Sequence, residues 1–320
     1  MRKLLLPLLL LGTPLPAAAE TPPITAATSA TITPRLVPPL DRALAYRLTK
    51  EKVTKVASEK AVFDQEVTFT KAGDGYAMSL RSLRLEQDGK TFDLTKDDMA
   101  GLPATVRPFV LPMTIELDKD GRPLRLRDWP RYQKALADVV PLMAQEAEPD
   151  PKKRPAAEEF FRRFLARYTA MSAENAAVAL VTGWPQVLAE LGHAVPLGRV
   201  ETSVMPMPSP FADGVIDYRT SLAGERDPAG ALRLTRKSEP TPEATRALVE
   251  GMARAVEQSA PKGGPVDAAA VRKGLAGLKA TLANRITFDG VTGLPREAVL
   301  EKLVTLPTGE GTEKITLTAQ

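Results

Sequence analysis

The sequence lacks several residue types on which common protein chemistries depend. It contains no cysteine and a single histidine, His193, among 320 residues. The absence of cysteine excludes a disulfide framework, a cysteine-ligated zinc or iron–sulfur centre and a thiol nucleophile. A single histidine excludes a histidine-cluster metal site built within one chain. We therefore predict no metal site and no cofactor.

Aromatic residues are also scarce, and the charges nearly balance. Aromatic side chains make up 5% of the chain, which is few for the stacking surfaces that bind single-stranded nucleic acid. The formal net charge is +4, and two of the basic residues, Arg2 and Lys3, stand at the N-terminus. Because so balanced a chain has no basic excess for phosphate backbones, we predict no nucleic-acid partner.

The N-terminal residues indicate export. Arg2 and Lys3 precede an apolar run over residues 4–11, and three alanines ending at Ala19 follow. A basic start, a short apolar stretch and a small-residue cleavage site are typical of a secretory signal peptide. The run is far shorter than the about 20 residues of a membrane-spanning helix. We predict a signal peptide over residues 1–19, cleavage after Ala19, and a periplasmic or secreted protein without an integral membrane span.

Two further parts are expected after the signal peptide. Residues 20–40 are rich in proline, threonine and alanine and show no sustained periodicity, which is typical of a flexible leader. Residues 41–320 are predicted to form a single α+β domain. Two related halves, 41–195 and 196–320, are an alternative organisation of the same residues.

The first strands follow from a two-residue periodicity. Leu44, Tyr46 and Leu48 alternate with polar or small residues, as in a strand that buries one face. In a later segment the apolar phase slips by one residue between Leu80 and Leu83. Such a slip predicts a β-bulge at this point of the strand.

Helical periodicity replaces this pattern in two blocks. The first runs from about residue 131 to Gly192. The second begins at Thr241, a good N-cap, and contains an apolar stripe from Val271 to Leu282 that predicts a helix. Strands are expected before, between and after these two blocks.

This order of elements predicts the fold class. Strands with one apolar and one polar face are typical of antiparallel sheets. Helices gathered in two blocks, instead of one helix after each strand, favour an α+β protein over a doubly wound one. We predict a curved antiparallel sheet, an open sheet or unclosed barrel, whose apolar face is covered by two inserted helical blocks.

No catalytic motif is present, and we predict no catalytic residue. The sequence contains no G-x-S-x-G, P-loop or G-x-G-x-x-G. His193 follows Gly192 at an expected helix end, where a cation interacts favourably with the helix dipole, so a structural role is favoured. The candidates for lining a ligand pocket between the sheet and the helices are aromatic: Trp129, Tyr132, Phe161, Phe164 and Trp184.

Several phrases of the sequence resemble the exported, sheet-rich families around the LolA/LolB lipoprotein-carrier fold. They are Tyr-Arg-Leu at 46–48, Ile-Glu-Leu-Asp-Lys-Asp-Gly at 115–121 with Leu-Arg-Leu at 124–126, and Ile-Thr-Phe-Asp-Gly-Val-Thr-Gly-Leu-Pro at 286–295. The resemblance implies an unclosed barrel that holds acyl chains against its apolar concave face, under helices that act as a lid. It assigns no binding residue position by position.

We expect a non-enzymatic protein that binds or carries an apolar ligand or a lipidated envelope component. One alternative is a module that interacts with or scaffolds another envelope protein through its sheet edge or polar face. A second is a hydrolase with an unrecognised carboxylate site. An apolar cavity of about 300 Å³ or more would favour the carrier over the scaffold. Converging carboxylates with a raised pKa would favour the hydrolase.

Overall fold

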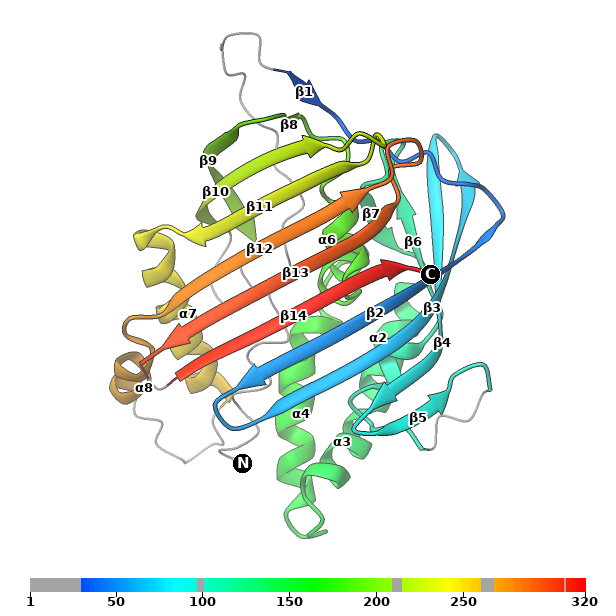
Figure 1. The fold of residues 1–320 in the computed structure, drawn as a ribbon. Coiled ribbons are helices and arrows are strands. Elements are labelled where there is room, and N and C mark those ends of the chain that lie inside the picture. The colour runs from blue at the N-terminus through cyan, green and yellow to red at the C-terminus, as the bar shows by residue number, and fades with distance from the viewer. Residues whose placement is uncertain (1–29, 97–100, 209–214, 260–267, 308) are drawn as a thin grey trace.

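A computed structural model describes residues 30–96, 101–208, 215–259, 268–307 and 309–320. Its main feature is one large antiparallel sheet of twelve strands that does not close on itself. Figure 1 shows this sheet face-on, with helices behind it. The predicted fold class, a curved open antiparallel sheet with inserted helices, is confirmed. Along the sheet the strand order is β7-β6-β4-β3-β2-β14-β13-β12-β11-β10-β9, with β5 paired to β4.

The first half of the sheet is built from the N-terminal strands. Long strands form here because β-branched, aromatic and aliphatic side chains alternate with polar ones. In β2 this pattern buries Tyr46 and Leu48 while Arg47 stays exposed. The strands are β2 (Ala43–Thr54), β3 (Ser58–Ala72), β4 (Gly75–Gln87), β5 (Lys90–Asp93), β6 (Met113–Leu117) and β7 (Pro123–Leu126).

The predicted bulge lies in β4. Arg84 pairs with Asp64 of β3, but the next pair along is Ser82 with Gln65, so Leu83 is the extra residue. The bulge lets Leu80 and Leu85 both face the interior although they are five positions apart, an odd spacing that would place them on opposite faces of a regular strand. The slip in apolar phase is therefore confirmed as a change in strand register.

The second half of the sheet continues the first without a break. The last strand, β14, pairs with β2, and Leu317 lies opposite Leu48 in the register. The largest core cluster contains buried residues from both halves, including these two. The remaining strands of the sheet are β9 (Val200–Pro208), β10 (Val215–Arg226), β11 (Leu232–Pro240), β12 (Lys279–Phe288), β13 (Pro295–Leu306) and β14 (Gly309–Ala319).

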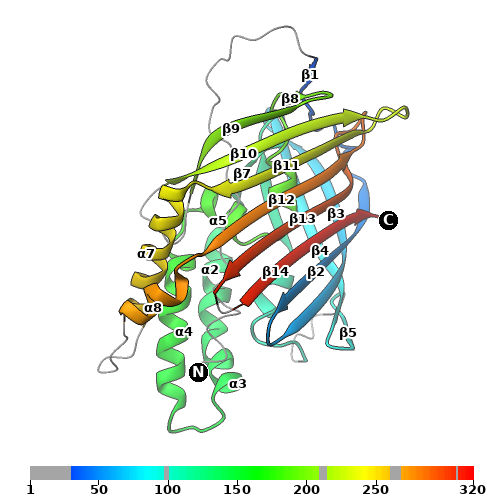
Figure 2. The same cartoon turned by 60° about the vertical axis from the view of Figure 1, so that its left-hand side comes forward.

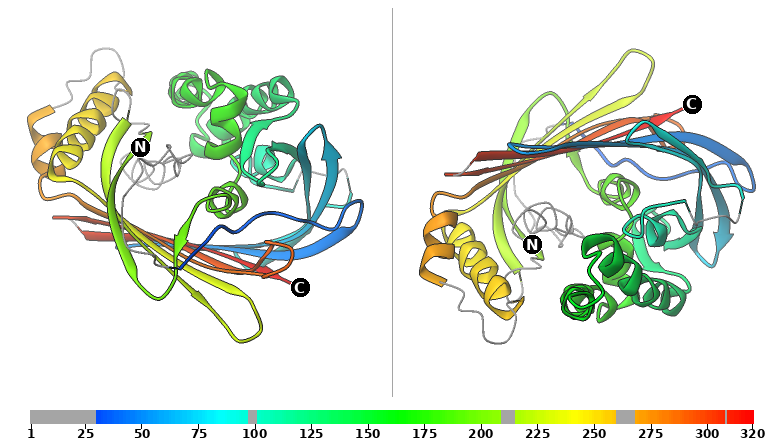
Figure 3. Two further views of the ribbon diagram at one scale, coloured as in Figure 1. Left: turned by 90° about the horizontal axis from the view of Figure 1, so that it is seen from above. Right: turned by 90° about the horizontal axis from the view of Figure 1, so that it is seen from below.

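The first helical block covers the concave face of the sheet, as the two views along the vertical axis show (Figure 3). Pro141 and Pro185 stand near helix starts, and the block is divided into short helices there, because proline fits the first turn but not a helix interior. A short 3-10 helix, η1 (Arg107–Val110), precedes it. The helices are α2 (Trp129–Asp138), α3 (Val140–Ala147), α4 (Arg154–Thr169), α5 (Ala173–Ala179) and α6 (Trp184–Leu188).

The second block, α7 (Pro242–Ser259) and α8 (Ala268–Leu275), connects β11 to β12 and lies at one end of the sheet (Figure 2). Thr241 caps α7 as predicted, since its Oγ1 accepts from the Ala244 amide at 3.2 Å. The helix predicted from Val271 through Leu282 is wrong in its second part. Helix α8 ends at Leu275, and Gly277 has a φ of +83°, which reverses the chain into β12.

Residues 30–40, the described part of the predicted leader, are bound to β8, in a separate two-stranded sheet, and to turns between strands of the large sheet. Strand β1 (Thr31–Ile32) pairs with β8 (Val195–Pro196), and the Val37 amide donates to the Thr292 carbonyl at 2.8 Å. Leu36 is 1% exposed. Pro34, Leu36 and Pro38 are buried and alternate with exposed residues, so the described part of the predicted leader packs against the folded domain. The predicted signal peptide and the start of the predicted leader lie outside the described residues.

Candidate functional site

A cavity of about 490 Å³ separates the first half of the sheet from the first helical block. This volume lies within the range of about 300–1,000 Å³ that is typical of ligand pockets. The exposed residues Glu59, Lys60 and Phe109 stand at its edge, so the cavity reaches the surface there. It therefore meets the size that we set for a carrier.

The sheet supplies one wall of the cavity. Leu48 of β2 and Phe63 of β3 lie directly opposite each other in the register and both line the cavity. Side chains two residues apart share a face of a strand, so the positions that follow on the same face are Lys50 of β2 and Ala61 of β3. This wall changes from apolar to charged along the strand direction.

The helices supply the opposite wall, which is mainly apolar. Phe161 and Phe164 lie one turn apart on α4, and the Phe164 ring is 5.8 Å from that of Tyr168. These residues share a helix face because three- and four-residue steps return to the same side. The helix side chains that line the cavity are Leu136, Val139, Met143, Glu146, Ala147, Phe161, Phe164, Leu165 and Tyr168.

Lysines and glutamates stand at the charged end of the sheet wall. Lys50 forms an ion pair with Glu313 of β14 at 2.9 Å, and Lys52 lies in register between Glu59 and Glu313. Lys302 of β13 follows in the same row, opposite Glu313. Burial lowers the pKa of Lys52, and burial also lowers the pKa of Lys302, to about 8. Both ammonium groups are therefore held where water solvates them poorly.

Gln65 places an amide on the inner part of the cavity wall. It lies opposite Tyr46 in the register and is 7% exposed. Its Oε1 atom is buried and has no hydrogen-bond partner among the described residues. Because buried polar groups are nearly always paired, this amide is a polar group available to whatever occupies the cavity.

The structure separates the five aromatic residues predicted as pocket-lining. Phe161 and Phe164 line the 490 Å³ cavity. Tyr132 lines a different, smaller pocket. Trp129 and Trp184 are absent from the walls of both, and they occupy the core of the helical block. The sequence indicated that the two indoles are buried, but it did not indicate which aromatic side chains face the cavity.

The two tryptophans attach the helices to their surroundings. The Trp184 ring is fully buried and meets Tyr46 of β2 edge to face, with 4.7 Å between ring centroids. The Trp129 indole donates from Nε1 to the Met171 carbonyl at 2.9 Å, which links the start of α2 to the end of α4. Both contacts are structural ones between neighbouring elements.

Sequence reasoning missed Lys50, Lys52 and Gln65 as cavity residues. A signal for the lysines was present, since they continue the spacing of Leu44, Tyr46 and Leu48 and so fall on the inward face. A charged residue on the buried face of a strand indicates a paired or functional group. Gln65 gave a similar signal, since it falls on the spacing of Phe63, Val67 and Phe69 and so on the inward face of its strand.

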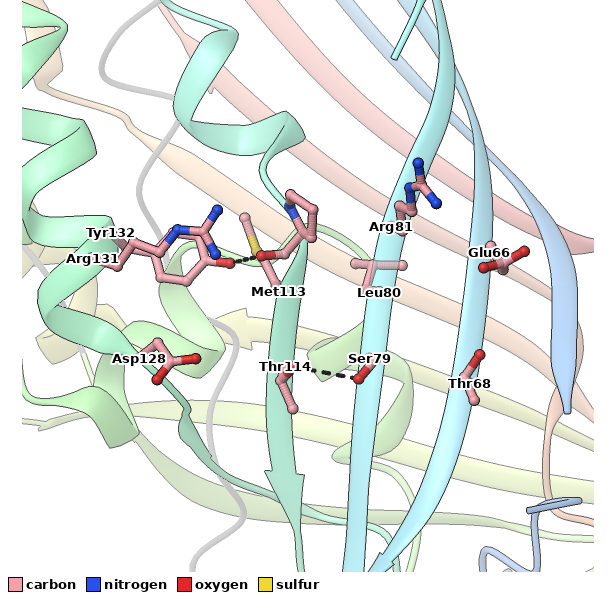
Figure 4. A pocket seen from close by; sticks show the side chains of 11 residues that line it. Glu66, Thr68, Ser79, Leu80, Arg81, Met113, Thr114, Asp128, Arg131 and Tyr132 are labelled. Atoms are coloured by element: carbon pink, nitrogen blue, oxygen red, sulfur yellow. Dashed lines mark hydrogen bonds between the residues drawn. The ribbon is translucent and has the colours of Figure 1, made fainter. Parts of the chain in front are cut away.

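The smaller pocket, of about 290 Å³, is polar (Figure 4). Ser79 of β4 and Thr114 of β6 lie with their hydroxyl oxygens 3.3 Å apart on one side of it. On the other side the Tyr132 hydroxyl donates to the Pro112 carbonyl. Its charged residues balance, with Glu66 and Asp128 against Arg81 and Arg131, so it has no preference for a ligand of one charge.

A buried ion pair joins the end of the first helical block to the second half of the sheet. Glu190 Oε2 lies 2.7 Å from an Arg236 nitrogen, and Glu190 Oε1 accepts from the Asn284 amide at 3.1 Å. His193 lies nearby, and burial, with the charges of Arg122 and Arg236, lowers its pKa to about 4. The interpretation of His193 as a cation at a helix end is therefore wrong, because the ring is neutral at pH 7.

The described part of the chain contains neither a candidate metal site nor a candidate membrane-spanning helix. No group of three or more histidine, aspartate or glutamate side chains is placed there to hold a metal ion. No helix of the described residues combines the length and the apolar character that crossing a bilayer requires.

Comparison with known proteins gives distant likenesses in fold. No protein-family model matches the chain, and no curated protein sequence matches it. A lipovitellin structure, described under lipid–protein interactions in lipovitellin, is 9% identical over 87% of this chain, with a TM-score of 0.44. The likeness covers 25% of that chain, so this chain spans about a quarter of its length.

A second solved structure is MucB in complex with MucA(peri). It is 11% identical, and the alignment covers 87% of this chain and 88% of that one, with a TM-score of 0.12. At these TM-scores neither likeness supports an inference about function. The resemblance to the LolA/LolB families stays a prediction.

Proposed function

We propose that this protein binds an apolar or amphiphilic small molecule, such as a lipid chain, in the cavity between β2–β4 and α2–α4. The observation that carries the proposal is the cavity itself. It offers about 490 Å³ between an alternating sheet face and the apolar face of a helix, and it reaches the surface. Removal of a ligand's apolar area from water at such a wall gives about 25 cal/mol per Å².

Filling the cavity tests this proposal. Ala61→Trp places a large ring on the cavity wall, whereas Ala45→Trp makes the same change on the exposed opposite face of β2. We expect the neutral fluorescent probe N-phenyl-1-naphthylamine to bind the unaltered protein and Ala45→Trp saturably at one site. We expect Ala61→Trp to lose at least about tenfold in affinity. Equal affinity in all three proteins would contradict the proposal.

A natural ligand is sought by native mass spectrometry of the protein as extracted from its own cells. A copurifying mass that disappears in Ala61→Trp but persists in Ala45→Trp would identify an occupant of the cavity. A clean mass of the unliganded chain, together with no probe binding, would contradict binding of apolar molecules.

We infer that the protein acts in the periplasm or outside the cell, after cleavage following Ala19. Support comes from the N-terminal residues, which have the basic, apolar and small-residue order of a signal peptide. Intact-mass measurement of the cellular protein tests this inference. A mass that includes residues 1–19 would contradict it.

The hydrolase alternative gains no support from the described carboxylates. Those with a clear shift have their pKa lowered, mostly by hydrogen bonds from basic side chains or backbone amides; examples are Glu51, Glu116 and Asp289. A general acid would need the opposite direction. The absence of enzyme activity remains a prediction.

A further inference from the structure

We propose that the cavity takes a single-chain amphiphile with an anionic head group, a carboxylate or a phosphate, whose head lies at Lys50 and Lys52. This inference rests on the proposed function and names the class of ligand. It follows from the order of residues along one strand wall, from the charges beside that wall and from a buried, unpaired amide oxygen deeper in the cavity.

The order along β2 separates an apolar end from a charged end. Tyr46 and Leu48 are buried against the helices, and Lys50 and Lys52 follow at the same spacing on the same face. At about 3.3 Å per residue, Leu48 and Lys52 lie about 13 Å apart along the strand. In an amphiphile lying along this strand, the apolar chain therefore contacts apolar side chains. Its head contacts the ammonium groups of Lys50 and Lys52.

The neighbouring strand shows the same order. Phe63 lies opposite Leu48, Ala61 opposite Lys50 and the exposed Glu59 opposite Lys52. The charged row is thus at the end where the cavity reaches the surface. An anionic head placed there is paired with ammonium groups while its chain is buried, which avoids the high cost of burying an unpaired charge.

The charges near the head position have a positive excess. The cavity is lined by Lys50, Lys52, Lys60, Glu59 and Glu146, and Lys302 and Glu313 stand in the adjoining row, giving four positive groups against three negative ones. Burial disfavours the charged form of Lys52 and of Lys302 even with these glutamates present. A bound carboxylate or phosphate would add a negative charge and make a charge-assisted hydrogen bond, whereas a cationic head would raise the repulsion.

Gln65 is a separate observation that points to an occupant. Its buried Oε1 atom lines the apolar part of the cavity without a partner among the described residues. Such an atom is destabilising if nothing bonds it. A hydroxyl on the ligand, or water that enters with it, would remove that cost.

Isothermal titration with four dodecyl compounds tests the head-group preference. Laurate and dodecyl phosphate are anionic, monolauroylglycerol is neutral and dodecyltrimethylammonium is cationic; all are used below their micelle concentrations. We expect the anionic compounds to bind about tenfold more tightly than the neutral one. Inorganic phosphate alone should not bind, because it lacks the chain.

A paired substitution locates the head. In Lys50→Gln/Lys52→Gln we expect laurate and dodecyl phosphate to lose about tenfold in affinity while monolauroylglycerol binds as before. Lys314→Gln is the matched control, since Lys314 lies beside Glu313 on the opposite face of β14. It removes a positive charge near the site but should change neither affinity.

The outcomes separate this inference from the proposed function. If none of the four compounds binds, the proposed function fails. If anionic and neutral compounds bind equally, or the double variant binds laurate as tightly as the unaltered protein, the head-group inference fails and the proposed function stands. Should the double variant not fold, salt dependence decides: rising ionic strength must weaken laurate binding and leave monolauroylglycerol unchanged.

Discussion

The rings of Tyr46 and Trp184 meet edge to face, with centroids 4.7 Å apart and an interplanar angle of 77°. One ring belongs to β2 of the large sheet and the other to α6, which comes more than a hundred residues later in the chain. The contact therefore fixes the end of the first helical block to the sheet. It also explains why Trp184 lies outside the cavity walls.

Trp184→Ala should lower the free energy of unfolding by about 3–5 kcal/mol, because it removes a fully buried ring and leaves a void. Urea unfolding followed by circular dichroism measures the loss. Val56→Ala, at a residue that is 79% exposed, is the control and should stay within about 0.5 kcal/mol of the unaltered protein. A Trp184 variant of unchanged stability would contradict the structural role.

Gly293→Ala should detach the strap of residues 30–40. A Cβ at Gly293 would lie 2.0 Å from the Arg35 carbonyl oxygen, and the φ of +66° is already unfavourable for alanine. Gly73→Ala is the matched control, since it has a φ of +55° but nothing within 4 Å of the new atom. We expect about 1–2 kcal/mol of destabilisation in the control and clearly more in Gly293→Ala.

Hydrogen exchange of the Val37 amide gives a local readout for the same pair of variants. That amide donates to the Thr292 carbonyl at 2.8 Å, next to Gly293. Its exchange should accelerate in Gly293→Ala and stay as in the unaltered protein in Gly73→Ala. Equal protection in both variants would mean that the strap does not depend on this close approach.

The stability of the protein should fall as the pH falls from about 6.5 to about 4. His193 has an ordinary pKa of 6.5 and a folded-state pKa of about 4, because it is buried beside Arg122 and Arg236. Between these values the unfolded chain binds a proton that the folded chain does not, so protons favour unfolding. Allowing for partial exposure, the loss is about 2 kcal/mol, and it stops growing below the folded-state pKa.

Because His193 is the only histidine, its titration can be followed directly by NMR. His193→Gln should flatten the dependence of unfolding free energy on pH in the same interval. A measured folded-state pKa of His193 near 6.5 would contradict its proposed contribution to the pH dependence of stability.

Removal of Glu190 should be far more costly than removal of a surface carboxylate. Glu190→Ala leaves the mostly buried Arg236 without its partner at 2.7 Å, and the loss of one member of a buried pair costs about 3–5 kcal/mol. Glu301→Ala, which breaks the exposed Arg285–Glu301 pair at 3.1 Å, should cost at most about 1 kcal/mol. Thermal unfolding compares the two variants; equal losses would contradict the role of the buried pair.

Much of the fold could be predicted from the order of apolar and polar residues that are close together in the sequence. The alternation of Leu44, Tyr46 and Leu48 predicted a strand, and the phase slip before Leu83 predicted a bulge. Both were confirmed, since a strand side chain faces the core or solvent according to its position alone. The stripe from Val271 to Leu282 predicted too long a helix, because α8 ends at Leu275 and Gly277 reverses the chain within the stripe.

The candidate site was less predictable. Five aromatic residues were proposed as pocket-lining, yet only Phe161 and Phe164 line the larger cavity. An indole such as Trp184 is equally suited to a core and to a binding wall, and the packing of α6 on β2 decides between them. The sequence shows that a residue is apolar but not which neighbour covers it.

The sequence alone predicts an export signal, and it determines the antiparallel character of the strands and the two helical insertions. Each of these depends on residues that are close together along the chain. The tertiary structure decided that β14 pairs with β2, that residues 30–40 bind β8 and the turn at Thr292, and that Lys50 and Lys52 line an apolar cavity. These relationships join residues that are far apart in sequence, and the pairing of distant strands is fixed by packing of the whole core, not by local preference.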